Sequence, residues 1–232
     1  MTRRTPGGGG GRFLRALKGF VPGHISNRTV LFVYHLLSGH GRFRHPGILR
    51  ETDREAGERQ GFHLIEDQRR RTMEVFGRST VAHAGCEVIA LYNAVGTLTG
   101  QMTEPLSRWN EVFRRRGMVF GGRFGTSPKA LYRWLCKNRF SVVWETREEL
   151  FDKTAQGFPC AILSYYNDRS DLFRGVHTVC LTREGNGFVA HNLTEDGNRG
   201  PVYPGIRELL QTASGGKAKG LCLIGVGPRK DP

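Results

Sequence analysis

Apolar side chains recur every three or four residues from about residue 86 onward, and this spacing predicts an amphipathic helix that begins at Cys86. The apolar stripe is broad, so we expect the helix to be buried along much of its length. The stripe consists of Val88, Leu91, Val95 and Leu98, with Ile89 and Tyr92 widening it.

Start and stop signals predict three further helices downstream. One covers 104–116, and another covers 128–138, where Ser127 is the expected N-terminal cap and a proline takes the first helical position. Thr146 and Glu149 have the spacing of a capping box. We expect this box to open a helix that runs to about residue 156.

The later part of the chain carries β-strand patterns. Gly185 and Asn186 form a strong turn signal between two apolar runs, which predicts a β-hairpin. Helices first and antiparallel strands afterwards indicate the α+β fold class. The expected strands are 140–145, 159–166, 176–182, 188–193 and 220–225, with a short helix near 206–212.

Composition narrows the class of protein. With 232 residues, 38% hydrophobic and 24% charged, the chain is long enough and apolar enough for one sizeable core. The longest dense apolar run, 30–37, is much shorter than the ~18 residues a spanning helix needs. The five cysteines include no CxxC pair and are odd in number, which argues against a zinc finger or a disulfide framework. We expect a cytoplasmic protein with reduced thiols and no cofactor or metal.

Positive charge is concentrated near the N-terminus. The net charge is +14, and residues 1–50 hold nine basic side chains and no acidic one. We expect a basic, glycine-rich and partly flexible region with short helices over 1–75 and a compact domain over 76–232. Residues 1–50 could contact an anionic surface, and 12–21 has an amphipathic pattern suited to packing on the domain or to binding a membrane surface or a partner. No strong nucleic-acid motif accompanies these charges.

Cys86 is the first candidate for chemistry. A thiol at the start of a helix faces unpaired backbone N–H groups and the positive end of the helix dipole, which favour thiolate. The same N–H groups can hold an oxyanion during acyl transfer. The alternative is a small buried cysteine in a turn.

The predicted hairpin supplies the second candidate. If Glu184 pairs with Gly187, then His177 and Asn192 are diagonal neighbours on one face of the sheet. An amide oxygen of Asn192 could then orient the imidazole, and the imidazole could take the proton of the Cys86 thiol. A three-residue loop would shift the register and make His191 the better-placed side chain.

The candidate residues follow the order found in papain-like cysteine peptidases. That order is a cysteine at a helix start, then a histidine on a strand, then an asparagine after a turn. The segments GCEVIALYNAV (85–95), GFPCAIL (157–163) and GVHTVCLTREGNGFVAHN (175–192) resemble the compact bacterial branch of that superfamily. This branch includes the bacteriocin-processing, double-glycine leader peptidase domains of ABC transporters and their stand-alone relatives. The resemblance covers about residues 76–226 and implies a papain-like fold with Cys86 as nucleophile, His177 as general base and acid, and Asn192 as the residue that orients His177.

Three positions depart from the pattern of that branch. Where a glutamine often assists the oxyanion hole, six residues before the nucleophile, this chain has Thr80, preceded by Ser79. Glu87 follows the nucleophile where glycine is usual, and a carboxylate there opposes thiolate formation unless it points to solvent or pairs with an arginine. Asn192 is followed by Leu193, not by proline.

The leading hypothesis is a cysteine peptidase or amidase that attacks a peptide-like acyl substrate and passes through a thioester. An acyltransferase would use the same residues and differ only in what reaches the thioester. The alternative hypothesis is that the protein is not an enzyme but a binding module. It would keep the papain-like fold with an idle site and attach through its basic N-terminal region to an anionic surface or to nucleic acid.

Overall fold

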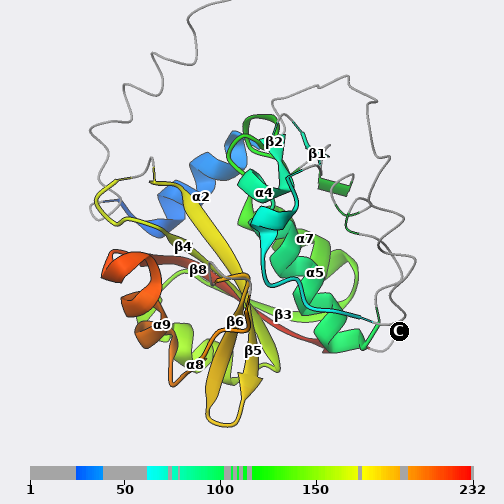
Figure 1. Ribbon diagram of the computed structural model, residues 1–232, viewed down its shortest axis with the longest axis vertical. Helices are drawn as coiled ribbons and strands as arrows, with labels where there is room; N and C mark the ends of the chain where they lie inside the picture. Colours follow the sequence, from blue (N-terminus) through cyan, green and yellow to red (C-terminus); the bar gives the residue numbers. More distant parts are fainter. Residues whose placement is uncertain are drawn as a thin grey trace, which may run out of the picture.

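The computed structural model describes residues 25–38, 62–72, 75–77, 79–101, 106, 109, 112–113, 117–171, 174–193 and 198–230. Within them, a six-stranded antiparallel sheet in the order β3-β8-β4-β5-β6-β7 forms the centre of the molecule (Figure 1). The strands are β3 (Phe140–Glu145), β4 (Cys160–Tyr166), β5 (Val176–Glu184), β6 (Gly187–His191), β7 (Val202–Tyr203) and β8 (Lys219–Arg229).

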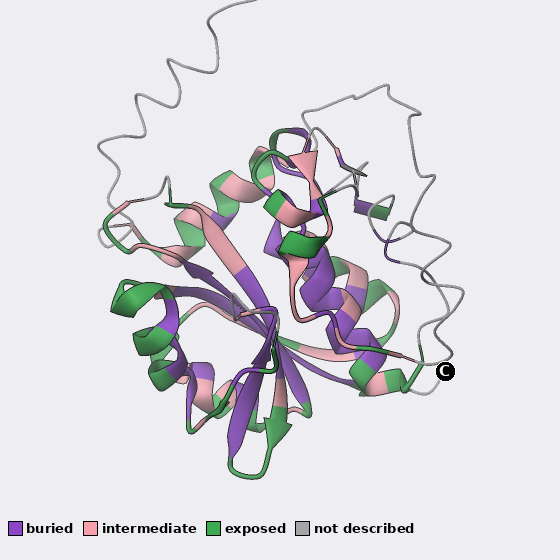
Figure 2. Cartoon of the chain, in the orientation of Figure 1, coloured by how far each residue is buried: buried purple, intermediate pink, exposed green. Residues whose placement is uncertain are grey.

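Helices cover both faces of this sheet (Figure 1). On one face lie α5 (Cys86–Thr99) and α7 (Pro128–Lys137), and on the other lie α8 (Phe151–Gln156) and α9 (Ile206–Thr212). Side chains alternate along the strands, so Cys160 and Ile162 of β4 pack under α5 while Ala161 and Leu163 pack under α8 and α9. The central strands are therefore buried on both faces (Figure 2).

Smaller elements complete the described part of the chain. Two short strands, β1 and β2, pair with each other, and β2 leads directly into the single-turn helix α4, whose end adjoins α5. The bounds are α2 (Asn27–Leu36), β1 (Val75–Phe76), β2 (Ser79–Thr80) and α4 (Val81–Ala84), with short 3₁₀ segments at Gln68–Arg70, Phe120–Gly122, Glu148–Leu150 and Ala213–Gly216.

The predicted α+β class is confirmed, and so are the helix beginning at Cys86, the helix after Ser127 and the later strands. Leu106, Trp109, Val112 and Phe113 are helical, as expected for 104–116, whose other residues lie outside the described ones. The predicted capping box is wrong. Neither Thr146 nor Glu149 caps a helix, because the chain first forms a 3₁₀ turn and α8 begins only at Phe151.

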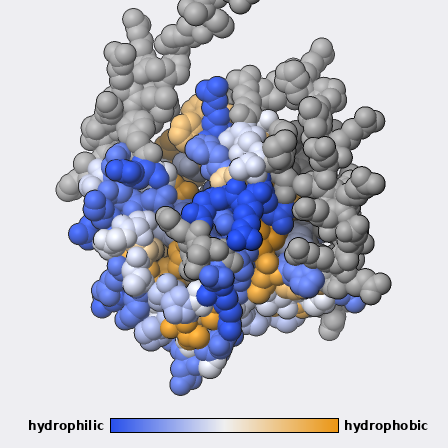
Figure 3. Space-filling model, in the orientation of Figure 1, coloured by the Kyte–Doolittle hydropathy of each residue, from blue (hydrophilic) through white to orange (hydrophobic). Residues whose placement is uncertain are grey.

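Part of the region before residue 76, where we expected the compact domain to begin, packs on the core. Leu31 of α2 is buried with Tyr166, Leu221 and Cys222, although Phe32 on the same helix is exposed. Residues 1–24, including the amphipathic pattern at 12–21, lie outside the described part of the chain. Figure 3 shows hydrophilic side chains over much of the described surface in this view, with apolar ones in smaller patches.

The segment 62–72 is fastened to α5 by Asn93. This fully buried side chain accepts a hydrogen bond from the Ile65 N–H and donates one to the Ile65 carbonyl, both at 2.9 Å. A single amide thus satisfies both backbone groups of a residue that belongs to no helix or strand.

Asn93→Ala is expected to lower the free energy of unfolding by about 2–4 kcal/mol, because it leaves two backbone groups of Ile65 without partners. Urea denaturation measures the change. Asn138→Ala is the control, since that amide contacts only a carbonyl of its own helix, that of Trp134, and should cost less than about 1 kcal/mol. Equal losses in the two variants would contradict the role given to Asn93.

Candidate active site

Cys86 is the first residue of α5 and is 5% exposed. The helix packs against β5, where a hydrogen bond with the backbone of Thr178 favours the thiolate. Thr178 directly follows His177 on β5. The fold therefore brings the thiol to β5, the strand that carries the candidate base. It does so near the start of β5, before the residues that pair with β6.

The Cys86 thiol is protonated in this setting. Its Sγ donates a hydrogen bond to Oε2 of Glu87 at 3.3 Å. Burial, and after it the negative charge of Glu87, raises the pKa of Cys86 well above its ordinary value. Dipole effects at a helix start amount to about 1 kcal/mol, less than the desolvation of a buried thiolate. The effect of burial therefore outweighs the expected stabilisation of the thiolate by the helix start.

Glu87 is buried rather than turned to solvent, with 1% of its surface exposed. Burial raises the pKa of this carboxyl to about 7, while hydrogen bonds from its own backbone and that of Thr126 pull in the opposite direction. A Cβ atom on Gly125 would lie 2.6 Å from both carboxylate oxygens. The loop at 125–126 thus closes tightly around Glu87, and Gly125, with φ +71°, suits the turn.

His177 is held in one tautomer. Its Nε2 donates a hydrogen bond to the backbone carbonyl of Asn192 at 2.8 Å, and its ring meets Tyr165 edge to face at 5.7 Å. Burial lowers the pKa of His177, so the ring is neutral at pH 7. With Nε2 carrying the proton, Nδ1 is left as the acceptor.

The hairpin has the predicted two-residue turn, because Glu184 pairs with Gly187 and Cys180 with His191. Asn192 does reach His177, but through its backbone carbonyl and not through its side-chain amide. The reason is that Asn192 leaves the strand with φ +65°, which turns its amide elsewhere.

That amide pairs with Gln68, a residue that the sequence analysis did not identify. The Asn192 Oδ1 accepts from the Gln68 N–H at 2.9 Å, and the Asn192 Nδ2 donates to the Gln68 Oε1 at 2.8 Å. Gln68 lies in a polar stretch far from any motif, so nothing local marks it. Only the long-range packing of 62–72 shows its place.

His191, the alternative from the other register, is bound elsewhere. Its Nδ1 lies 2.7 Å from Oε1 of Glu66, and its Nε2 lies 2.7 Å from the Thr182 hydroxyl. Both ring nitrogens are therefore occupied by partly buried structural contacts, one of which holds Glu66.

Thr80 and Ser79 precede the thiol in the chain, in β2. Both belong to β2, paired with β1, and the turn of α4 separates them from Cys86. Neither hydroxyl makes a hydrogen bond to the residues that the structure describes, so no contact supports the oxyanion role expected for them.

The surroundings of the site hold no cluster suited to a metal. Within the described ranges, no group of three or more His, Cys, Asp or Glu side chains lies close enough together to bind one. No helix in the same residues has the length and apolarity to cross a membrane.

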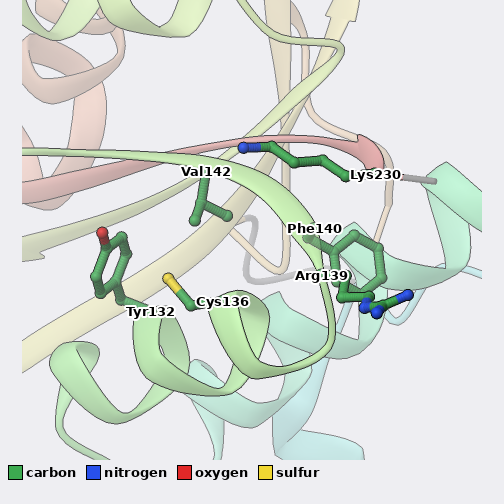
Figure 4. Close-up of a pocket in the computed structure, with 6 residues that line it drawn as sticks. All are labelled: Tyr132, Cys136, Arg139, Phe140, Val142 and Lys230. Atoms are coloured by element: carbon green, nitrogen blue, oxygen red, sulfur yellow. The ribbon is translucent and has the colours of Figure 1, made fainter. Parts of the chain in front are cut away.

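A surface cavity of about 470 Å³ lies between α7 and β3, and none of the candidate residues lines it (Figure 4). Its basic side chains, Arg139 and Lys230, extend in different directions in Figure 4 and do not converge on one point. The cavity therefore forms no recognisable anion site.

Comparison of the chain with models of protein families, with curated proteins and with solved structures found no match. The case for a function therefore rests on the geometry around Cys86.

Glu87→Gln is expected to increase stability at high pH. The folded-state pKa of Glu87 is about 7, against an ordinary value of 4.5, so the unfolded chain loses this proton first and rising pH favours unfolding. The free energy of unfolding should fall by on the order of 3 kcal/mol more in the wild type than in Glu87→Gln between about pH 4 and pH 8. Urea denaturation across that range measures the difference.

The control for this comparison is Glu149→Gln, which alters an exposed carboxyl and should follow the wild-type curve. The assignment fails if Glu87→Gln and Glu149→Gln have the same pH dependence.

Glu87→Gln should also make the thiol more reactive. Removing the carboxylate charge lowers the pKa of Cys86, and iodoacetamide labelling at a fixed pH near 8 should accelerate roughly tenfold. Peptide mass mapping gives the rate at each cysteine, and exposed Cys136 is the internal reference. A Cys86 rate that stays the same or falls, with Cys136 unchanged, would show that Glu87 does not restrain the thiol.

Proposed function

We propose that the protein is a cysteine-dependent hydrolase of papain type, acting on a peptide or related acyl amide. The observation that carries the proposal is the meeting of α5 and β5. Cys86 at the helix start lies against the backbone of Thr178, next to His177, whose Nε2 is fixed by Asn192. The α+β arrangement of helix and antiparallel sheet is compatible with a papain-like fold.

In the proposed reaction, the thiol turns from Glu87 toward His177, and Nδ1 of His177 takes its proton as sulfur attacks the carbonyl carbon. Backbone N–H groups in the first turn of α5 stabilise the oxyanion. The imidazolium then gives its proton to the leaving amine, and the C–N bond breaks to leave a thioester on Cys86. Water, deprotonated by His177, attacks the thioester, releases the acid and restores the thiol.

The charges of the resting site specify the kind of catalysis. The Cys86 thiol is protonated and His177 is neutral, so the site starts as a thiol and an imidazole and not as a thiolate–imidazolium pair. Proton transfer must accompany attack, which makes His177 a general base. An acceptor amine in place of water would turn the same steps into acyl transfer.

The setting of the thiols fits the proposal. Cys86 is free, as the nucleophile must be, and the other four cysteines are free as well. Free thiols are typical of a reducing compartment, and we propose a cytoplasmic location.

A second candidate function is a binding module with an idle site. The burial of Cys86 and its hydrogen bond to Glu87 favour it, because both keep the thiol unreactive. In this case the basic residues of 1–50 would attach the protein to an anionic surface or nucleic acid.

Acylation of Cys86 separates the two candidates. With p-nitrophenyl acetate as probe, the wild type should release nitrophenol and carry one acetyl group on Cys86, found by peptide mass mapping. His177→Ala should slow this acylation by about 10²-fold or more, and Cys86→Ala should abolish it.

Cys136→Ser is the matched control, since Cys136 is the exposed cysteine, and it should react on Cys86 as the wild type does. Acetylation confined to Cys136, or a Cys86 rate indifferent to His177→Ala, would reject the hydrolase in favour of the binding module.

A further inference from the structure

We infer that Gln68 is a positioning residue for His177 and acts through Asn192. The inference deepens the proposed function and rests on it for its catalytic meaning. Its structural basis is a hydrogen-bonded path from Gln68 to the Asn192 amide and from the Asn192 carbonyl to the His177 Nε2.

Gln68 holds Asn192 from two sides. The Gln68 N–H and Oε1 bind the two ends of the Asn192 amide, at 2.9 and 2.8 Å. Such a pairing fixes the plane of the amide as well as its position. Asn192 has φ +65°, a left-handed conformation that asparagine adopts more readily than most residues, and the two Gln68 contacts fix its side chain in that conformation.

The same glutamine also binds the thiol side of the site. Its Nε2 donates to the Ala82 carbonyl at 3.0 Å, and α4, which contains Ala82, is separated from Cys86 by Gly85 alone. Gln68 therefore connects the segment that leads to the nucleophile with the residue that holds the base. The Ala82 carbonyl thus takes one of the two Nε2 protons, and the contacts of the side chain are those of a positioning residue.

Neighbouring residues hold Gln68 itself in place. Glu66 accepts a hydrogen bond from the Asn192 N–H at 3.2 Å and contacts Nδ1 of His191 at 2.7 Å. Ile65 is held by Asn93 on α5. We call residues 65–68 the strap. It is fixed at both ends of its short length, so the Gln68 side chain starts from a defined backbone.

The inference gives a specific expectation for the tautomer of His177. The Asn192 carbonyl keeps the proton on Nε2 and leaves Nδ1 to accept. Without Gln68, the Asn192 carbonyl turns away and the ring distributes its proton between both nitrogens. A purely structural role would lower stability without changing the tautomer of the folded protein.

Nitrogen-15 NMR of ring-labelled histidine, at a pH where His177 is neutral, tests this on the full chain. The wild type should show His177 as the Nε2–H tautomer, assigned by the loss of its signals in His177→Ala. Gln68→Ala should give averaged nitrogen shifts, whereas Gln68→Glu should keep the wild-type tautomer. Both variants keep the backbone N–H that binds the Asn192 Oδ1 and both lose the donor to Ala82, but only glutamate keeps an oxygen for the Asn192 Nδ2. Glutamate is therefore the variant to rely on if alanine prevents folding.

Gln211→Ala, on the exposed side of α9, is the control and should match the wild type. In the acylation assay, Gln68→Ala should reduce the maximal rate about tenfold with little change in the probe concentration at half-maximal rate, and Gln68→Glu should restore most of it. A folded Gln68→Ala protein that keeps the pure Nε2–H tautomer would overturn the inference. So would a Gln68→Glu protein that folds but loses that tautomer.

The result is separable from the proposed function. A tautomer that depends on Gln68 in a protein whose Cys86 is never acylated would uphold the positioning role and reject the hydrolase. Acylation that depends on His177 but not on Gln68 would uphold the hydrolase and reject the positioning role of Gln68.

Discussion

The unpaired end of β5 is the feature on which the site depends. β6 pairs with β5 from Glu184 back to Cys180, so among the described residues no strand pairs with the start of β5 on that side. A free edge in a protein interior must find other partners for its backbone groups. The start of α5 meets that need at Thr178, whose backbone hydrogen-bonds Cys86. The Asn192 carbonyl lies at the same edge, where it accepts from the side chain of His177.

Electrostatics at this edge are set mainly by the lack of water. Burial raises the pKa of both Cys86 and Glu87 and lowers that of His177, so each group favours its neutral form. The thiol donates to the Glu87 carboxyl, and the negative charge of that carboxyl adds to the effect of burial on the pKa of Cys86. The reactivity of the thiol therefore depends on the protonation state of its neighbour.

The parts of this arrangement that follow from local pattern were predictable. The apolar stripe after Cys86 fixes α5, and the Gly185–Asn186 turn fixes the register that carries His177 toward Asn192. The parts that depend on long-range contacts were not. The orientation of Asn192 follows from a left-handed backbone and from Gln68, more than a hundred residues earlier, and the burial of Glu87 follows from a loop that closes over it. Thr146 failed as a cap because the chain entered α8 through a 3₁₀ turn.

The strap ties the site to a segment that precedes the sheet in the sequence. The sheet and α5 join segments from the later two-thirds of the chain, yet the tether of Asn192 comes from residues 65–68, before all of them in sequence. A chain shortened to residues 76–232 would keep every residue of the Cys86, His177 and Asn192 set and lack the amide that aligns them. The nucleophile and base thus lie after residue 76 in the sequence, while the residues that hold Asn192 lie before it.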